Sequence, residues 1–274
     1  MSLHERTALV SGSGRGIGRE IALKLASHGA RVVVNDLDPG PAAETVAAIR
    51  SAGGAAVACP GSVTEAGFAE RFVATGVDAF GGIDIIVNNA GYTWDAILQR
   101  MTDEQWEDIL DVHLKAPFRI LRAAQPVIAA AAKAEIAERG SARCRKVVNI
   151  ASVAGLAGNA GQANYAAAKA GVTGLTKTVA KEWGRYNVTV NTVAFGLIRT
   201  RLTQPVVDDA RIDVGGRQIR VGVSERILEA ATSQIPLGRA GTPEDAAGAV
   251  FLLCTPESDY ISAQTIVCGG GWNG

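Results

Sequence analysis

The stretch TALVSGSGRGIG, residues 7–18, joins a short apolar run to a glycine-rich loop, and an amphipathic segment at residues 17–28 follows at once. This order predicts a buried strand, a tight loop and a helix. The first turn of a helix offers unpaired backbone N–H groups, and glycines let an anion approach without a Cβ in the way. We therefore expect a pyrophosphate-binding loop; a glycine-rich turn without a ligand is the alternative.

Short runs rich in branched apolar residues recur along the rest of the chain. They lie at residues 31–36, 55–59, 83–88, 146–151, 188–194 and 264–268. Longer segments of helical period lie between them, at residues 41–52, 66–80, 103 to about 137, 163–186 and 243–253. Alternation of strand and helix predicts right-handed crossovers. We expect one α/β domain over residues 1–274, with about seven parallel strands and helices on both faces of the sheet.

Two segments interrupt this alternation. The polar stretch at residues 138–145 is expected to be a surface excursion before the fifth strand. A long insertion at about residues 203–235 follows the sixth strand, and within it residues 212–223 are expected to form a small hairpin before a helix from Ser224. Insertions of this length in a compact domain are usually lids or partner surfaces. We expect a substrate lid.

Composition narrows the classes of ligand. Lys plus Arg and Asp plus Glu are equal at 27 each, so no net field favours nucleic acid or an anionic membrane. The four cysteines are far apart and form no Cys-x-x-Cys pair, which argues against a metal site. Residues 1–6 lack the start of a signal peptide, and no long uncharged apolar run is present. We expect a cytoplasmic protein with a small-molecule substrate and no metal, membrane or nucleic-acid partner.

An acidic residue, Asp36, ends the second apolar run about eighteen residues beyond Gly18. A carboxylate there accepts hydrogen bonds from the adenosine ribose hydroxyls and repels a 2′-phosphate. NAD is therefore favoured over NADP, although Arg15 is placed to meet such a phosphate; the alternative is that Asp36 only caps the turn before Asp38. Cofactor contacts are also expected from the turn after the fourth strand, at the edge where open parallel sheets bind ligands: Asn89, Ala90 and Gly91.

Ser152 stands at the end of the fifth strand, and Tyr165 and Lys169 share one face of the next helix because they are four residues apart. A phenol with the ordinary pKa of about 10 is a weak acid at neutral pH. An ammonium about 4 Å away is expected to lower the pKa of Tyr165 by a few units, and Ser152 to hydrogen-bond a substrate oxygen as charge develops on it. A lone Tyr-x-x-x-Lys is often only a packing pair. Its position at the sheet edge that carries the glycine loop favours catalysis.

Together these motifs resemble the classical short-chain dehydrogenase/reductase family over essentially the whole chain. The matching positions are Gly12, Gly16 and Gly18 of the glycine loop, residues 88–91 of an Asn-Asn-Ala-Gly turn, and the catalytic set Ser152, Tyr165 and Lys169. Residues 235–239 and 269–271 are similar to the 3-oxoacyl-(acyl-carrier-protein) reductase branch. The resemblance implies a Rossmann-type doubly wound sheet and, for Lys169, an additional contact with the nicotinamide ribose. The cofactor contacts that it implies are Gly12, Ser13, Arg15, Gly16, Ile17, Gly18, Asp36, Ser62, Val63, Asn89, Ala90, Gly91, Tyr165, Lys169, Gly196, Ile198 and Thr200.

Three positions depart from the family pattern. His113 stands where the family usually has the asparagine that helps hold a water in the proton relay from lysine. Imidazole can both donate and accept a hydrogen bond, so a relay role and a buried structural histidine both remain open. Phe195 replaces a proline after the sixth strand, and Ser62 replaces the aspartate that contacts adenine.

The leading hypothesis is an enzyme that moves a hydride between NAD(H) and a secondary alcohol or ketone, with Tyr165 as general acid and base. By resemblance, a 3-oxoacyl thioester is the favoured substrate, and a homotetramer or homodimer joined through the helical segments at residues 103–137 and 163–186 is the expected assembly. The alternative from a different class is a non-catalytic dinucleotide-binding sensor or scaffold. Such a protein is expected to have lost the tyrosine or the lysine, and this chain has both.

Overall fold

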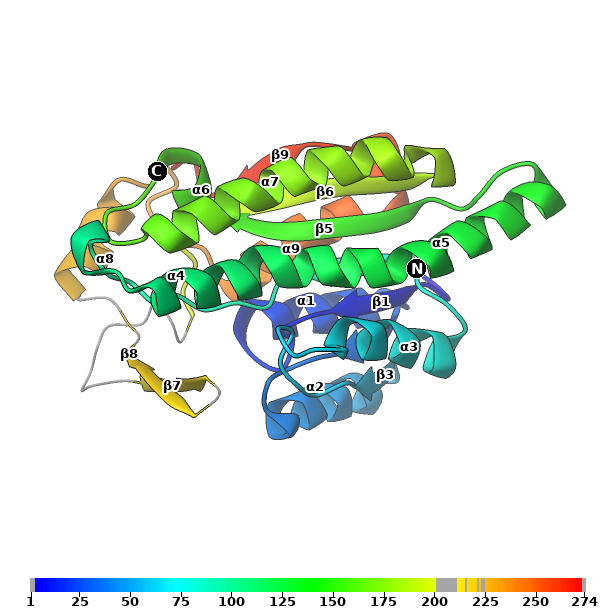
Figure 1. Ribbon diagram of the computed structural model, residues 1–274. Coiled ribbons are helices and arrows are strands. Elements are labelled where there is room, and N and C mark those ends of the chain that lie inside the picture. The colour runs from blue at the N-terminus through cyan, green and yellow to red at the C-terminus, as the bar shows by residue number, and fades with distance from the viewer. Residues whose placement is uncertain (1–2, 201–210, 215, 221, 223–224, 273–274) are drawn as a thin grey trace.

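A computed structural model describes residues 3–200, 211–214, 216–220, 222 and 225–272. Within these ranges the main sheet has seven parallel strands in the order β3-β2-β1-β4-β5-β6-β9 (Figure 1). The expected doubly wound α/β fold is confirmed. The strands are β1 (Thr7–Val10), β2 (Arg31–Val34), β3 (Ala55–Ala58), β4 (Ile85–Asn88), β5 (Arg145–Ser152), β6 (Val188–Phe195) and β9 (Thr265–Cys268).

Helices cover both faces of the sheet. On one face lie α1 (Gly16–Ser27), α2 (Pro39–Ser51) and α9 (Pro243–Cys254). On the other lie α3 (Phe68–Phe80), α5 (Ala116–Arg139) and α7 (Ala163–Trp183). Successive residues of β1 enter the two cores in turn, since Ala8 and Val10 pack under α1 and Leu9 packs under α3. Burial on both faces explains why the strands are continuous apolar runs rather than alternating ones.

The segment expected to be one helix from residue 103 to about 137 is divided. It consists of α4 (Asp103–Leu110), a π-helical turn (Asp111–Lys115) and α5. A capping box fixes the start of α4, because the Thr102 side chain accepts the Gln105 N–H while the Gln105 side chain accepts the Thr102 N–H. The π turn adds a residue to the helical repeat and so changes the direction in which later side chains point. The residue at the centre of this turn is His113.

The surface excursion expected at residues 138–145 is confirmed for residues 138–141 and 143, which are exposed, and is wrong for Arg145. Helix α5 continues to Arg139, and Arg145 begins β5 with only 4% of its surface exposed. The Arg145 guanidinium is held by the Glu135 carboxylate, with Nη2 and Oε1 2.7 Å apart. A buried arginine is stable when its charge and donors are paired, and the pairing partner lies on α5, ten residues earlier.

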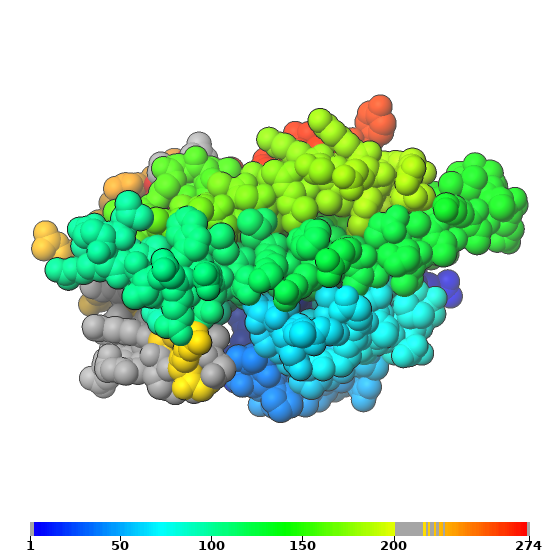
Figure 2. Space-filling view, in the orientation of Figure 1, coloured from blue at the N-terminus to red at the C-terminus, as the bar shows by residue number. Residues whose placement is uncertain are grey.

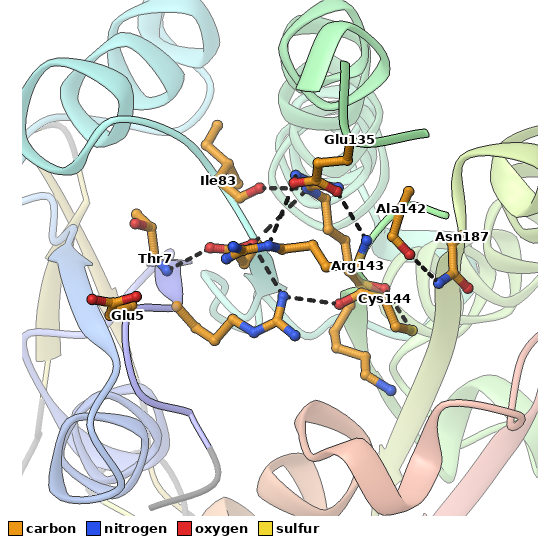
Figure 3. Close-up of polar contacts among 12 residues, drawn as sticks. Glu5, Thr7, Ile83, Glu135, Ala142, Arg143, Cys144 and Asn187 are labelled. Atoms are coloured by element: carbon orange, nitrogen blue, oxygen red, sulfur yellow. Dashed lines mark hydrogen bonds and ion pairs between the residues drawn. The ribbon is translucent and has the colours of Figure 1, made fainter. Parts of the chain in front are cut away.

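This ion pair belongs to a network at the amino edge of the sheet (Figure 3). The backbone N–H of Arg143 donates to Glu135 at 2.9 Å. Arg6 donates to Asp84 and to the Cys144 carbonyl, both at 3.2 Å, and the Asp84 carboxylate also accepts the N–H of the first residue of β1 at 3.0 Å. The network therefore fixes the start of β1 against the start of β5, at the end of the sheet away from the predicted site.

The insertion contains the predicted hairpin, β7 (Arg211–Val214) paired antiparallel with β8 (Arg217–Arg220), followed by α8 (Glu225–Ser233). Residues 203–210, 215, 221, 223 and 224 of the expected lid lie outside the described residues. In the space-filling view the part of β8 that is drawn in yellow lies against the teal side chains of α4 (Figure 2). Among the described residues, the helices are all too short or too polar to cross a bilayer.

We predict that Glu135→Gln lowers the free energy of unfolding by about 3 kcal/mol, because it leaves the charge of Arg145 buried without its partner. The measurement is urea unfolding followed by circular dichroism. The control is Glu138→Gln, whose carboxylate is 74% exposed on the same helix; this variant is expected to stay within about 0.5 kcal/mol of the parent. Equal effects of the two substitutions would contradict the assignment.

Candidate active site

The glycine loop lies between β1 and α1, as predicted. Gly12 and Gly16 have positive φ angles of 61° and 53°, which favour glycine over any other residue. A Cβ on Gly12 would lie 2.7 Å from the Ala90 Cα, and one on Gly18 would lie 2.0 Å from the Gly12 carbonyl oxygen. No side chain caps the first turn of α1. The loop is thus a tight backbone cradle above a helix N-terminus.

Hydrogen bonds join this loop to the turn that follows β4. The Ser11 hydroxyl oxygen accepts the N–H groups of Asn89 at 3.0 Å and Ala90 at 3.1 Å. The Asn89 side chain in turn donates to the carbonyls of Ser11 and Gly12, both at 3.0 Å. Between β1 and β4 the chain changes the direction in which it winds along the sheet, and ligands of open α/β sheets bind at such a switch point.

The end of β2 meets the same loop through Asn35 and Asp36. Asn35 is buried; its side-chain oxygen accepts the Gly12 N–H at 3.1 Å and its amide donates to the Cys59 carbonyl at 3.0 Å. Sequence reasoning did not single out Asn35, although a polar residue at the end of a buried apolar run was the available signal. A Cβ on Gly14 would lie 2.5 Å from the Asp36 Oδ2, so the carboxylate lies directly against the loop.

Ser62 and Val63 lie in the segment after β3. The Ser62 hydroxyl is 2.8 Å from the Thr64 hydroxyl and also accepts the Thr64 N–H at 3.2 Å. Val63 is buried in the core under α3. The N–H of Gly61, just before them, donates to the Asp36 carbonyl at 2.9 Å. This segment therefore borders the loop that carries Asp36.

Ser152, Tyr165 and Lys169 meet at the carboxyl ends of β5 and β6. Ser152 is the last residue of β5, and its side chain lies beside the Tyr165 phenol. Lys169 is 3% exposed; its ammonium donates to the Ile150 carbonyl at 2.7 Å and lies 5.6 Å from the centre of the Tyr165 ring. Ser152 and Tyr165 are each partly exposed, whereas Lys169 is buried.

Asn164 fixes the start of α7 beside this cluster and was missed by sequence reasoning. Its side-chain oxygen accepts the Tyr165 N–H at 2.8 Å, and its amide donates to the carbonyls of Trp94 at 3.2 Å and Gln105 at 2.9 Å. Asn164 is fully buried. One side chain thus ties the start of α7 to the loop after β4 and to α4.

The expected lowering of the Tyr165 pKa is wrong in this structure. Burial raises the pKa of the Tyr165 phenol to about 12; the Ser152 hydrogen bond opposes this shift and the charge of Asp95 adds to it. Burial also lowers the pKa of Lys169 to about 7. The low-dielectric surroundings penalise the charged form of both groups, and this cost exceeds the attraction that the spacing of the two residues predicts.

The π turn places His113 in the same cluster. Its Nε2 is 2.7 Å from the Tyr92 carbonyl oxygen, and its ring meets the Tyr165 ring edge-on at 5.0 Å. A Cβ on Gly91 would lie 1.9 Å from the imidazole, so glycine is required there. Burial, followed by the charge of Lys169, holds the pKa of His113 well below its usual range. The ring is therefore neutral, with its proton on Nε2 and an acceptor at Nδ1.

The remaining predicted contacts follow β6. The Gly196 N–H donates to the Cys268 carbonyl at 3.0 Å, and a Cβ there would lie 2.8 Å from the Gly269 Cα. Ile198 is buried and forms a parallel bridge with Gly241. Thr200 is the last described residue before the insertion. These residues border the same carboxyl edge, one strand beyond Ser152.

The hairpin of the insertion is attached to the loop after β4 by Arg217. The Arg217 guanidinium pairs with Glu104 at 2.9 Å and with Asp108, both on α4, and lies 5.9 Å from the centre of the Trp94 ring. Burial, followed by the charge of Asp108, raises the pKa of the nearby Tyr92 phenol to about 12. The sequence alone did not identify Arg217 as this contact.

Comparison with known sequences identifies the family to which this chain belongs. The model of a family described as Enoyl-(Acyl carrier protein) reductase matches residues 12–273. This chain belongs to the short-chain dehydrogenase/reductase family. The "Short-chain reductase protein NovJ" of Streptomyces niveus is 38% identical over 269 residues, 97% of this chain and 94% of that protein.

Two further relatives and a solved structure extend this finding. The "3-oxoacyl-[acyl-carrier-protein] reductase FabG" of Vibrio cholerae is 38% identical over 99% of this chain and 98% of its own. The protein of the same name from Staphylococcus aureus is 37% identical over 97% of each chain. The crystal structure of a dehydrogenase/reductase from Sinorhizobium meliloti 1021 has a TM-score of 0.82 and 30% identity, and covers 98% of this chain and 96% of that one.

We predict that Lys169→Met flattens the pH dependence of stability between pH 7 and pH 10. The lysine has a pKa of about 7 when folded and of 10.5 ordinarily, so the unfolded chain binds more protons in this window. The free energy of unfolding then rises with pH, by at most about 1.4 kcal/mol per pH unit from this group. Urea unfolding at several pH values measures the slope. Lys177→Met, at an exposed position on the same helix, should keep the parent slope; equal slopes for all three proteins would refute the burial effect.

Proposed function

We propose that this chain is an NAD(H)-dependent oxidoreductase that interconverts a ketone and a secondary alcohol. The observation that carries the proposal is the meeting of Ser152, Tyr165 and Lys169 at the sheet edge that also carries the glycine loop. Relatives that cover nearly the full chain are named 3-oxoacyl-(acyl-carrier-protein) reductases. These names support a 3-oxoacyl thioester as the substrate class and reduction as the direction of reaction.

The loop residues fit a dinucleotide. At Gly12, Gly14 and Gly18 a side chain would collide with neighbouring protein atoms, so the tight loop requires glycine at these positions. Its backbone N–H groups are proposed to bind the pyrophosphate. Asp36 and Lys169 would bind the two riboses, and Asn89, Gly196, Ile198 and Thr200 would line the remainder of the site. The other contacts proposed along the dinucleotide are Ser13, Arg15, Gly16, Ile17, Ser62, Val63, Ala90, Gly91 and Tyr165. A bound nicotinamide ring supplies or takes up the hydride.

Tyr165 is the proton donor in the direction of reduction. Its pKa of about 12 keeps the phenol protonated at neutral pH, which is the form that can donate to a ketone oxygen. The Ser152 hydroxyl, which lies beside the phenol, donates to the same oxygen as negative charge builds on it. The two hydroxyl groups thus hold the carbonyl and provide the proton.

Lys169 compensates for the charge that proton transfer creates. Its pKa of about 7 makes the ammonium and the amine similarly populated near neutral pH. When Tyr165 gives up its proton, the phenolate favours the ammonium form of its neighbour. Tyr165 can therefore become charged while the net charge of the Tyr165–Lys169 pair stays close to zero.

In the direction of reduction, His113 is the proposed entry point for the proton that replaces the one donated by Tyr165. Its Nδ1 is buried and has no hydrogen-bond partner within the described part of the chain, and an orphaned buried acceptor is a binding position for an ordered water. With a water donating to its Nδ1, His113 would take the place in the relay that an asparagine usually has. A purely structural histidine would satisfy its ring through the Tyr92 carbonyl alone.

The surroundings of the site support a lid and an assembly. The insertion at about residues 203–235 is proposed as the substrate lid, attached through Arg217 beside Trp94. We propose a homotetramer, or a homodimer, joined through α4, α5 and α7, where Trp106, Phe118 and Ile136 are exposed apolar side chains. A cytoplasmic location, with neither nucleic acid nor membrane as partner, accords with the balanced charge.

We predict that Tyr165→Phe lowers kcat about 10²-fold to 10⁴-fold, because the variant has no acid for the ketone oxygen. Nicotinamide absorbance is followed with NADH and with NADPH against acetoacetyl thioesters, hydroxysteroids, quinones and simple ketones. Tyr260→Phe, at a fully exposed position, is the matched control and should retain parent activity. Full activity of Tyr165→Phe would disprove its role, and cofactor binding without turnover on any substrate would favour the sensor instead.

We also predict an assembly of four or two chains, because burying the exposed apolar side chains of α4 and α5 between subunits removes apolar surface from water. Multi-angle light scattering on the purified protein measures the mass directly, and Phe118→Glu should shift the distribution toward smaller particles. A monomer across the micromolar range would contradict the proposed assembly and leave the proposed chemistry unaffected.

A further inference from the structure

Arg15 and Asp38 form an ion pair at the adenosine end of the proposed dinucleotide site. The Arg15 Nη1 and the Asp38 Oδ2 are 2.9 Å apart, and the side chains are 44% and 51% exposed. Arg15 is the last residue before α1, and Asp38 is the last residue before α2. The pair therefore links the start of α1 to the start of α2, and Asp36 lies two residues before Asp38.

Asp38 also fixes the direction of the Asp36 carboxylate. The backbone N–H of Asp38 donates to the Asp36 Oδ1 at 3.1 Å. The other carboxylate oxygen, Oδ2, is the atom that a Cβ on Gly14 would approach to 2.5 Å. The backbone N–H of Asp38 thus orients the Asp36 carboxylate, which is the proposed acceptor for the ribose. The side chain of Asp38 holds the Arg15 guanidinium.

Charge at this end discriminates between the two dinucleotides. Asp36, Asp38 and Arg15 together carry one net negative charge. An unmodified ribose offers hydroxyl donors to Asp36, whereas a 2′-phosphate would bring further negative charge to the same place. Arg15 is the loop cation suited to neutralise that phosphate, and to do so it must leave Asp38.

We propose that Asp38 is a specificity-determining residue that selects NAD over NADP by holding Arg15 away from the position of a 2′-phosphate. The inference rests on the proposed dinucleotide-dependent function and deepens it. It differs from the role of Asp36, which acts by direct contact with the ribose, because Asp38 acts through the availability of Arg15.

The test is the affinity for NADH and NADPH, each measured as a Kd from nicotinamide fluorescence without any substrate. Asp38→Asn keeps the backbone N–H that orients Asp36, and the Asp38 side chain makes no capping hydrogen bond to α2, so the fold should persist. We expect this variant to bind NADPH about fivefold more tightly, the range of an exposed ion pair, with the Kd for NADH changed less than about twofold.

Arg15→Gln separates release of the arginine from simple removal of a negative charge. In the parent chain this substitution should weaken the binding of NADH and of NADPH by the same factor, because the paired Arg15 can contact only the part that the two dinucleotides share. In the Asp38→Asn background it should abolish the fivefold gain. Asp78→Asn, a charge-matched exposed change on α3, should alter neither Kd.

Several results would overturn the inference. They are an unchanged NADPH affinity in Asp38→Asn, a gain that persists after Arg15→Gln, or an equal loss from Arg15→Gln in both backgrounds. If the parent chain prefers NADH, any of these results would leave the proposed function intact. A parent chain that binds neither dinucleotide would overturn both the inference and the proposed function, and one that prefers NADPH would overturn the inference and the cofactor choice.

Discussion

The parallel direction of the strands is the constraint on which the rest of the molecule depends. Because all seven described strands of the main sheet point the same way, everything that follows a strand lies at one edge. The glycine loop after β1, Asp36 after β2, Asn89 after β4 and Ser152 at the end of β5 are brought together for this reason. The bond from Asn89 to the Ser11 hydroxyl fastens two of these segments into a single surface.

Burial, rather than attraction between opposite charges, sets the electrostatics of the site. Tyr165 and Lys169 are both held toward their neutral forms, and His113 is neutral for the same reason. In the proposed reaction, Tyr165 stays protonated until it donates to a ligand oxygen. The negative charge that this transfer leaves on the phenolate would then favour the ammonium form of Lys169.

Much of this arrangement could be predicted from the sequence, and the failures have physical causes. Branched apolar runs and the glycines of the first loop determine the strands and the cradle locally. The π turn around His113 has no comparable signal, because it depends on how α4 and the turn pack against α7. Arg145 lies in a polar stretch yet is buried, since Glu135 on another element pairs with it. The pKa of Tyr165 was predicted in the wrong direction because spacing along a helix does not report burial.

In the proposed complex, one carbonyl oxygen is held by the hydroxyl groups of both Tyr165 and Ser152 while the dinucleotide lies in the glycine cradle. The decisive measurement is a crystal structure of the chain with NADH and an unreactive ketone analogue. We expect the analogue's oxygen about 2.6–3.2 Å from both hydroxyl oxygens and the pyrophosphate over residues 12–18. A dinucleotide bound elsewhere, or a carbonyl that contacts neither hydroxyl, would contradict it.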